Sequence, residues 1–403
     1  MFVKKRMYFD YAAGAAGNPS SPHEEGRRAK EVLENARLGI ARLVDVKSDD
    51  VIFTSGATES NALAILGHVR ALRLRAGRDA PERNNMHALY LPSAHASIVE
   101  NMHLLADEGV DSEPLPIRNG RIDTEMLGKM LRSETVLVSM DAVCGETGVV
   151  WNTREVAEVL KKARAEISEL ERESTPATGS TQHSFLGVPA HILLHVDASQ
   201  APLTEKISRA HFGADVITFD ASKVGAVRGI GVLVAHRTIP LVPLYGGGGQ
   251  ERGLRSGTEA PELARSFAAA LSAAVLGREP FRAFAETERK RLIQAITSTI
   301  PNVFIQEGQT QAPHILNLSL PGRDTDYLVA LLDEAGFAIS SKSACETDSE
   351  EGSRAVLALT ADKERARTTL RISWGPGTHS HDLTRLAHAL RDAVAFVDSK
   401  TAR

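Results

Sequence analysis

Short apolar runs rich in β-branched residues alternate with helix-like segments through the first two-thirds of this chain of 403 residues. The runs that fit buried strands span residues 51–54, 88–91, 135–139, 192–196, 216–218 and 231–234. Alternation of this kind predicts an α/β fold, with a mostly parallel sheet and helices on both of its faces. In such sheets the ligand lies at the carboxyl ends of the strands, so we expect functional residues directly after these runs.

The glycine-rich segment 246–249 separates this pattern from a different one. Beyond it the sequence predicts helices near 261–276, 279–299, 326–335, 354–359 and 381–397, and strands at 315–320 and 369–373. We therefore predict a large domain over residues 15–250 and a smaller α+β domain formed by residues 1–14 and 251–403. Residues 166–190 follow a predicted helix near 153–165, are polar and weakly patterned, and are expected to form a surface loop.

Composition excludes several classes of protein. The hydrophobic fraction of 42% and charged fraction of 24% are ordinary for a soluble globular protein, and a net charge of −4 offers no basic surface for nucleic acid. No apolar run approaches the ~20 residues that cross a membrane, and no apolar signal-peptide segment follows the basic start. Two cysteines argue against a disulfide framework and are too few for a zinc site, so we expect no metal and a cytoplasmic protein.

Lys223 and Asp197 each stand at the end of one of the apolar runs. A lysine held out of water at such an edge has a depressed pKa, and its neutral amine can form a Schiff base. A carboxylate on a nearby strand can keep a pyridine nitrogen protonated, so the pair predicts pyridoxal 5'-phosphate as the cofactor. Taken alone, Lys223 has the simpler interpretation of a solvated surface charge.

The segment 54–60 joins a predicted strand to the start of a helix. Its small residues let backbone N–H groups converge at a helix N-terminus, which favours an anion such as a phosphate, and Thr58 adds a hydroxyl. The alternative is a plain helix cap in a tight turn.

Three further side chains are candidates, each with a structural alternative. His95 could stack on a planar ring or cap a helix, and Gln200 could donate to a cofactor oxygen or be a solvated loop residue. Arg371 lies within an apolar strand, where its guanidinium needs an anion. That anion could be a substrate carboxylate, held by a bidentate pair, or the partner in a structural salt bridge.

Cys345 lies in a small, polar segment, residues 340–352. Structural cysteines prefer buried apolar positions, so a thiol in such a loop is a candidate nucleophile, although its acidic neighbours would raise its pKa. Cys144 lacks such flanks, and we expect it to have no catalytic role.

Together these residues resemble the cysteine desulfurases, in particular their NifS/IscS-like branch, within the class V aminotransferase group of pyridoxal-phosphate enzymes. The resemblance covers nearly the whole chain: segments 9–13, 17–21, 54–61, 197–200, 252–258 and 343–345, with His95, Lys223 and Arg371. It implies fold type I, with a mostly parallel seven-stranded sheet in the large domain. It also implies a smaller C-terminal domain that carries the cysteine loop, and a homodimer.

The resemblance implies a reaction and a set of roles. L-cysteine would become L-alanine, and Cys345 would take its sulfur as a persulfide for delivery to an acceptor protein, a scaffold or carrier as in iron–sulfur cluster assembly. Lys223 would bind the cofactor aldehyde and move protons, and Asp197 would pair with the ring nitrogen. Gln200 would bond the phenolate oxygen, and His95 would stack on the ring and relay protons.

The remaining implied roles concern the cofactor phosphate and the substrate carboxylate. Ala57, Thr58 and Ser222 would hold the phosphate, and Thr258 would reach it from the other subunit of the dimer. Arg371 would clamp the substrate carboxylate.

Three departures from the family pattern bear on this site. Between Ala13 and Gly17 a longer segment near the entrance is almost absent, and Gly145 stands where the family has an asparagine. Asp220 stands at a position that faces the phosphate, where two unit charges roughly 5 Å apart repel by about 3 kcal/mol at an effective dielectric constant of ~20. Asp220 could turn away, be offset by a basic group such as Arg228, or weaken cofactor binding, and we expect one of the first two.

Two other functions stay open at this point. One is another pyridoxal-phosphate lyase or aminotransferase of the same fold, such as a selenocysteine lyase. The other is a degenerate, non-catalytic partner in sulfur transfer, which the altered positions near the cofactor would suit. Lys223, Asp197 and Cys345 are all present, and this favours an enzyme.

Overall fold

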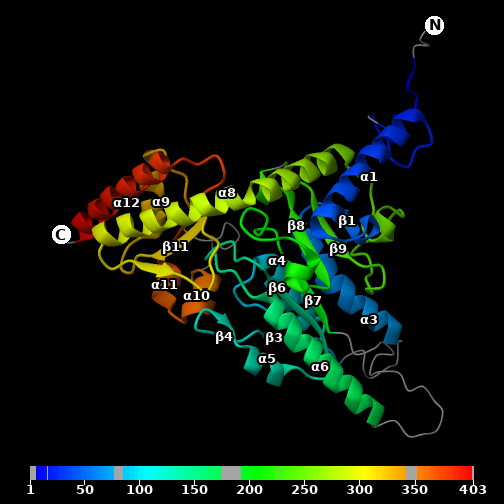
Figure 1. Cartoon of the computed structure of the whole chain (residues 1–403), viewed down its shortest axis with the longest axis horizontal. Helices are drawn as coiled ribbons and strands as arrows, with labels where there is room; N and C mark the ends of the chain where they lie inside the picture. Colours follow the sequence, from blue (N-terminus) through cyan, green and yellow to red (C-terminus); the bar gives the residue numbers. More distant parts are fainter. Residues whose placement is uncertain are drawn as a thin grey trace.

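A seven-stranded sheet forms the centre of the larger part of the molecule (Figure 1). The computed structural model describes residues 6–15, 17–76, 85–173, 192–225, 227–341 and 352–401. In sheet order the strands are β1 (Val51–Thr54), β9 (Gly231–Ala235), β8 (Val216–Asp220), β7 (Leu193–Asp197), β6 (Thr135–Asp141), β2 (His87–Tyr90) and β3 (Asp111–Pro114). Neighbouring strands from β3 to β8 run parallel, and β9 is antiparallel to both of its neighbours. This confirms the predicted α/β fold with a mostly parallel sheet.

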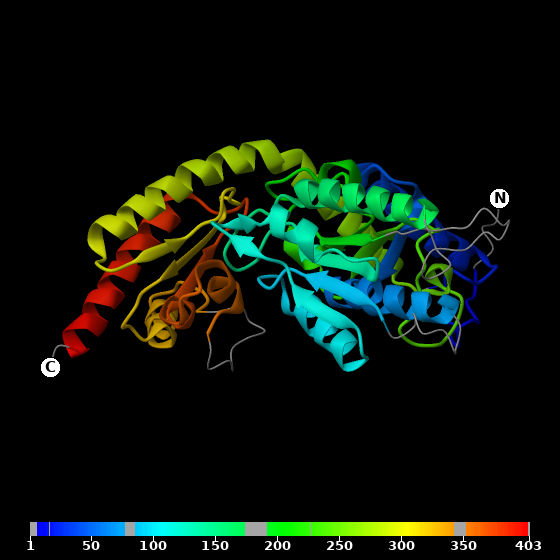
Figure 2. The same cartoon turned by 90° about the horizontal axis from the view of Figure 1, so that it is seen from below.

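The central strands are buried on both faces, which explains their nearly continuous apolar runs. Every residue of β6, β7 and β9 is buried. In Figure 2, α6 (Thr153–Glu173) lies above the sheet, and α3 (His68–Ala76) and α4 (Ala96–Asp107) lie below it. Each of the adjacent strands β6, β7 and β8 ends on an aspartate: Asp141, Asp197 and Asp220. These acids therefore gather at the edge where such sheets bind ligands.

Helix α6 continues to Glu173, well beyond the predicted end near residue 165. The prediction of a loop is therefore wrong for residues 166–173. That stretch is rich in Glu, Leu and Arg, which are strong helix formers, so the helix continues although its apolar pattern is weak. The rest of the predicted loop, residues 174–190, lies outside the described residues.

Helix α8 (Pro261–Thr299) is one continuous helix, where the sequence predicted two. It runs through Gly277 and Pro280 and follows a broad arc over the molecule (Figure 2). Proline removes one backbone donor and crowds the carbonyl of the fourth residue before it, which is Leu276. Leu276 is 80% exposed, so water can replace the missing hydrogen bond and the helix does not end.

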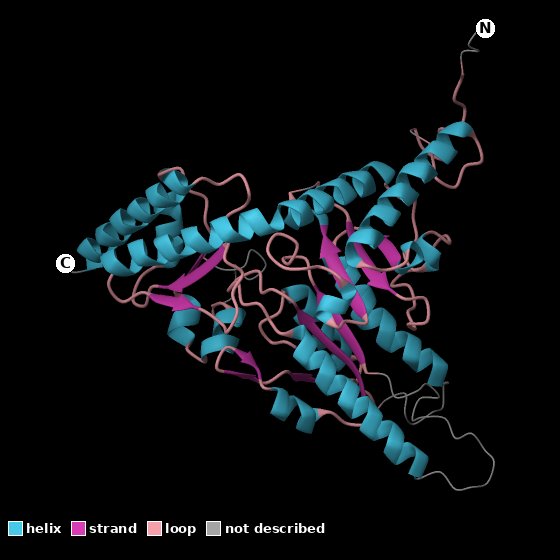
Figure 3. Ribbon diagram, viewed as in Figure 1, coloured by secondary structure: helices cyan, strands magenta, loops and turns pink. Residues whose placement is uncertain are grey.

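A second, smaller core surrounds a three-stranded antiparallel sheet of β10 (Phe304–Gln306), β11 (Ile315–Ser319) and β12 (Thr369–Ser373). Helices α9 (Thr325–Glu334) and α12 (Ser380–Thr401) pack there with the second half of α8 (Figure 3). Helix α8 supplies Phe267 to the first core and Phe281 to the second, so it joins the two parts of the molecule. The domain boundary at residue 250 stays a prediction.

The remaining elements complete the two parts. They are α1 (Glu24–Val44), α2 (Ala57–Ala62), the π-helical turn η2 (Leu63–Gly67), α5 (Thr124–Met130), α7 (Arg209–Phe212), α10 (Arg354–Thr360), α11 (Lys363–Arg367), the hairpin of β4 (Ile117–Arg118) and β5 (Arg121–Ile122), and the 3₁₀ turns η1 (Ser48–Asp50), η4 (Ala221–Val224) and η5 (Glu251–Gly253). None of the helices in the described part of the chain has the length and apolar character needed to cross a membrane.

Candidate active site

A pocket at the carboxyl ends of β6, β7 and β8 brings together four of the predicted site residues. Its lining includes Lys223, His95 and Gln200 from the large sheet's side and Arg371 from β12 of the smaller core. These residues are far apart in the sequence; the predicted parallel sheet makes the first three neighbours, and the smaller core brings Arg371 to them. The pocket therefore has a lysine, a histidine, an amide and a guanidinium facing one space.

Lys223 lies on η4, the 3₁₀ turn that follows β8. Gly225 ends the turn in the left-handed conformation, with φ of 79°, which glycine adopts without strain. The sequence predicted a lysine shielded from water, but in this chain Lys223 is exposed. The short turn, rather than the buried strand before it, sets the position of the lysine, which lines the pocket and is exposed to water.

Asp197 ends β7 and is buried, with its two carboxylate oxygens held by separate donors. Asn61 donates its side-chain N–H to Oδ2 at 2.7 Å, and the backbone N–H of Ser199 donates to Oδ1 at 2.9 Å. Asn61 also donates to the hydroxyl of Ser97 at 2.8 Å, and that hydroxyl lies 2.8 Å from Nδ1 of His95. One hydrogen-bonded chain thus fixes both the carboxylate and the imidazole. The role of Asn61 was missed by the sequence analysis, although it lies in the segment that carries the resemblance.

His95 caps α4, as its structural interpretation proposed, and it lines the pocket as well. Its Nδ1 accepts the backbone N–H of Ser97 at 3.2 Å, so the proton of the neutral ring lies on Nε2. Capping and pocket lining are therefore not alternatives here: the cap orients the ring.

Gly145, where the resemblance led us to expect an asparagine, lies against the side chain of Gln200. A Cβ atom at position 145 would lie 2.9 Å from Nε2 of Gln200, closer than Cβ atoms normally approach any group. The carbonyl of Gly145 accepts from the guanidinium of Arg371 at 3.1 Å, and Ser340 Oγ accepts from it at 3.3 Å. Gln200 thus occupies the space of the missing side chain, and Arg371 is held against the same loop. The clamping of a substrate carboxylate by Arg371 stays a prediction.

The predicted phosphate site contains an anion that belongs to the protein itself. The backbone N–H of Ala57, the first residue of α2, donates to Oδ2 of Asp220 at 2.8 Å. The backbone N–H and the hydroxyl of Ser222 donate to Oδ1 at 2.9 Å and 2.6 Å. The expectation that Asp220 turns away is therefore wrong: its side chain points at the donors because they converge beside the end of β8. Within the described part of the chain, no ion pair joins Arg228 to Asp220.

The site is thus well suited to the ring of pyridoxal phosphate and less well suited to its phosphate group. At the ring end, His95 and Gln200 line the pocket with Lys223, and the buried carboxylate of Asp197 is connected to His95 through Asn61 and Ser97. At the phosphate end the expected donors are present, and Thr58 is exposed beside them, but the donors of Ala57 and Ser222 bind Asp220.

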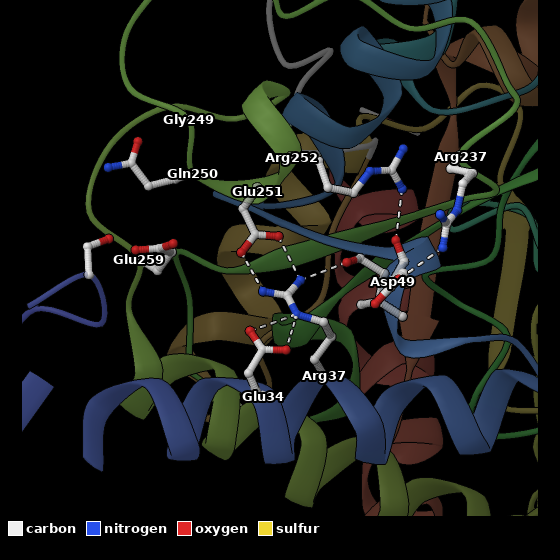
Figure 4. A pocket seen from close by; sticks show the side chains of 11 residues that line it. Glu34, Arg37, Asp49, Arg237, Gly249, Gln250, Glu251, Arg252 and Glu259 are labelled. Atoms are coloured by element: carbon white, nitrogen blue, oxygen red, sulfur yellow. Dashed lines mark hydrogen bonds and ion pairs between the residues drawn. The ribbon is translucent and has the colours of Figure 1, made fainter. Parts of the chain in front are cut away.

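Asp197, Ala57, Thr58 and Ser222 do not line this pocket themselves, and two further predicted residues belong neither to it nor to the donors around Asp220. Thr258 is exposed and does not line it, and Cys345 lies outside the described residues. A larger cavity of about 710 Å³ lies elsewhere, between α1 and the segment that contains Glu251 (Figure 4). It contains neither Lys223 nor Asp197, so its size does not make it the candidate active site.

Asp141, the last residue of β6, is a site residue that the sequence analysis missed. It lines the pocket, pairs in register with Asp197 on β7, and is 4% exposed. Its Oδ1 has no hydrogen-bond partner among the described residues. Burial, together with the neighbouring Asp197 carboxylate, raises the pKa of Asp141 well above its ordinary range. The signal that could have found it is the one used for Asp197, an acid directly after an apolar run.

Cys144 also lines the pocket, but it is not a good nucleophile. Its thiol is buried and donates to the carbonyl of Ser93 at 3.6 Å. Burial, reinforced by the Asp141 carboxylate, raises the pKa of the thiol to about 12, so the reactive thiolate is scarce at neutral pH.

Asp141→Asn is expected to stabilise the protein at pH 8 and to do so less at pH 5. A carboxyl whose folded-state pKa is raised favours folding below its unfolded pKa, and this contribution is lost as pH rises through the folded value. Asparagine cannot ionise, so the variant does not lose this contribution, and we expect its unfolding free energy at pH 8 to exceed that of the native protein. Urea unfolding at both pH values measures it, with Asp107→Asn, at the exposed acid that ends α4, as the matched control. A gain that is equal at both pH values would contradict this prediction.

The fold and this pocket define a class-V aminotransferase. The family model described as aminotransferase class-V matches residues 5–168 and 187–386, and the chain belongs to that family. Within it the chain is a cysteine desulfurase. It is 32% identical to the mitosomal cysteine desulfurase of Encephalitozoon cuniculi over 94% of this chain and 80% of that protein. It is 29% identical to cysteine desulfurase IscS 1 of Archaeoglobus fulgidus, over 94% of this chain and 90% of that one.

Solved structures share the fold. A NifS-like protein superposes with a TM-score of 0.79 at 24% identity, covering 96% of this chain and 93% of that one. DndA from Streptomyces lividans superposes with a TM-score of 0.68 at 32% identity, covering 91% of this chain and 94% of that one. These neighbours confirm the predicted fold type.

Proposed function

We propose that this chain uses pyridoxal 5'-phosphate to remove the sulfur of L-cysteine, releasing L-alanine and leaving a persulfide on Cys345. The observation that carries the proposal is the convergence of Lys223, His95, Gln200 and Arg371 on one pocket. The atoms balance without an outside oxidant: the carbon–sulfur bond of cysteine breaks, its sulfur bonds to the Cys345 sulfur, and a proton takes its place on the β-carbon. A structural neighbour, SspA, was solved in complex with cysteine, which supports this substrate.

The chain's own residues suit this reaction. When bound, pyridoxal phosphate supplies a protonated ring that accepts electrons from the α-carbon of the substrate. Asp197 would keep the proton on the ring nitrogen, and the 2.7 Å bond from Asn61 fixes that carboxylate. The amine of Lys223 would take and return the proton at the α-carbon. Arg371 would orient the substrate carboxylate within the pocket.

We infer that the working unit is a homodimer. The N-terminal arm, which projects from the molecule in Figure 1, exposes Met7, Phe9 and Tyr11, with 71%, 87% and 71% of each accessible to water. Exposed apolar side chains in sequence favour burial against another surface. Thr258, expected to serve the partner's cofactor, is exposed and is not among the residues that line the pocket of its own chain. Light scattering that gives one chain's 43.4 kDa would contradict the dimer.

The remaining elements of the proposal are the acceptor and the compartment. We propose that a scaffold or carrier protein takes the persulfide sulfur, as in iron–sulfur cluster assembly, and that the protein works in the cytoplasm. The names of the IscS relatives support the first, and the need to keep Cys345 reduced supports a reducing compartment.

The test is alanine formation from L-cysteine, with pyridoxal phosphate and a thiol reductant, by the native protein and by Cys345→Ala. We expect the variant to form alanine roughly a hundredfold more slowly than the native protein, or slower still, because it has no other reactive thiol to attack the substrate sulfur. Ser343→Ala, in the same segment, is the matched control and is expected to stay within a few-fold of the native rate. Full activity of Cys345→Ala would disprove the persulfide step. Transamination of a keto acid without alanine or sulfide would instead favour an aminotransferase of the same fold.

The position of Asp220 favours one alternative, a non-catalytic partner in sulfur transfer. Its carboxylate binds the donors of Ala57 and Ser222, which the cofactor phosphate would otherwise use. The visible absorbance that appears when pyridoxal phosphate condenses with an amine separates the two functions. Absence of that band at saturating cofactor would support the alternative.

A further inference from the structure

Asp220 fills an anion site that the fold builds from two separate segments. Its Oδ2 accepts the N–H of Ala57 at the start of α2, and its Oδ1 accepts two bonds from Ser222 on η4. The helical stretch that starts at Ala57 continues through η2 to the end of α3 at Ala76, so its N-terminus favours an anion. The carboxylate of Asp220 is the anion that the structure places there.

The backbone around this carboxylate leaves little room to widen the site. Gly56 has φ of 154°, a conformation that residues with a Cβ rarely adopt, and a Cβ there would lie 3.1 Å from Oδ2 of Asp220. A Cβ on Gly231, at the start of β9, would lie 2.7 Å from the backbone of Gly56. The loop is thus packed against both the carboxylate and β9. A second anion can enter only if the carboxylate leaves its donors.

We propose that Asp220 is a built-in competitor for the phosphate group of the cofactor, so that this site binds pyridoxal phosphate little more tightly than unphosphorylated pyridoxal. The proposal rests on the proposed function for the identity of the cofactor. Each N–H donor has one acceptor at a time, and a dianionic phosphate is repelled by a carboxylate at the same position. The phosphate therefore gains its donors only by displacing a group that is already well bound. The residues that bind the ring make no contact with the phosphate, so Asp220 does not change their contribution to cofactor binding.

Asp220→Ser and Asp220→Asn separate the carboxylate from the rest of the site. Serine removes both carboxylate oxygens, whereas asparagine keeps the size of the side chain and removes only its charge. We expect Asp220→Ser to lower the dissociation constant of pyridoxal phosphate ten- to a hundredfold and that of pyridoxal by less than twofold. For Asp220→Asn we expect a dissociation constant of pyridoxal phosphate between those of Asp220→Ser and the native protein. Titration of the visible absorbance of the full-length protein measures all the constants.

Inorganic phosphate tests the same site without the cofactor. At millimolar concentrations it is expected to raise the thermal midpoint of Asp220→Ser by several degrees and that of the native protein by less than one. Asp362→Ser is the matched control, because Asp362 caps a short helix, α11, by accepting N–H bonds from Glu364 and Arg365, and it neither lines the pocket nor contacts Asp220. Asp362→Ser loses an aspartate cap as Asp220→Ser does, but phosphate should not raise its thermal midpoint.

The outcomes decide between the possibilities. An unchanged ratio of the pyridoxal and pyridoxal-phosphate constants in both Asp220 variants would overturn the proposal, even if the protein releases alanine from cysteine. A raised ratio together with a phosphate response would support it, even if no variant desulfurates cysteine and the proposed function fails. If Asp220→Ser does not fold, as circular dichroism would reveal, Asp220→Asn decides on the same two measurements.

Discussion

Replacement of Lys223 by alanine is expected to reduce alanine formation from L-cysteine by roughly ten-thousandfold or more while leaving the fold intact. Among the described residues, Lys223 is the one amine that lines the pocket, together with His95, Gln200 and Arg371. Without it, no side chain in the described lining can both hold the cofactor aldehyde and move the proton at the α-carbon of the substrate. Because Lys223 is exposed on a short turn, its truncation removes little packing and the unfolding free energy should change by less than about 0.5 kcal/mol.

The control for this experiment is Lys161→Ala, which removes an exposed lysine from α6, away from the pocket. Both variants are assayed for alanine with pyridoxal phosphate present, and both are unfolded in urea. Added methylamine is expected to restore a small part of the activity of Lys223→Ala. It is expected to leave the activity of Lys161→Ala unchanged. A Lys223→Ala protein that keeps a tenth of the native rate would show that another group moves the proton.

The sequence was sufficient to predict the sheet because buried parallel strands have continuous apolar runs. Those runs also indicated which strands lead to candidate site residues, since Asp197 directly follows one run and Lys223 lies on the turn after β8. The same rule applied to β6 would have found Asp141, had the strand been extended by two residues beyond 139. Residues placed by regular secondary structure were therefore predictable.

Side-chain direction at the site was not predictable. The bond from Ala57 to Asp220 joins residues 163 apart in the sequence, and no local pattern shows that three donors converge beside this carboxylate. The expected repulsion from a phosphate led to the wrong orientation, because the protein's own N–H groups had not been considered as partners. The prediction that Lys223 is shielded from water was wrong for a related reason. The position of Lys223 is set by a four-residue turn, whereas the prediction relied on the strand before that turn.

A second residue of large expected effect lies outside the pocket, at the buried ion pair of Glu251 and Arg37. Glu251 is 6% exposed and accepts from both Nη atoms of Arg37, at 2.8 Å and 2.7 Å (Figure 4). The same carboxylate accepts the backbone N–H of Phe53 in β1 at 2.8 Å. Arg37 comes from α1, so the pair ties α1, β1 and the segment of η5 together. Burial would lower the pKa of Arg37, but hydrogen bonds and charge from Glu251 outweigh it and the pKa is raised.

The backbone at this ion pair is strained. Glu251 and Arg252 have φ of 47° and 63°, in the left-handed region that favours glycine. Conformations of this kind cost of order 1–3 kcal/mol each and persist only where other contacts hold them. Glu251 holds its own strained residue in place through its carboxylate. The segment that continues to Thr258 therefore depends on this pair for its position.

Glu251→Ala is expected to lower the unfolding free energy by about 3 kcal/mol, because it leaves both Nη groups of Arg37 buried without their carboxylate and Phe53 without its acceptor. Glu34, which lies 3.1 Å from Nε and is half exposed, remains as the other anion of Arg37. The double variant Arg37→Met, Glu251→Leu should recover more than half of that loss, since two apolar side chains leave no buried charge. Urea unfolding of the single and double variants measures the difference, with Glu262→Ala, an exposed acid at the start of α8, as the control. A loss below about 1 kcal/mol for Glu251→Ala, in the range of a surface ion pair, would mean that water reaches Arg37 and that the pair does not hold the turn.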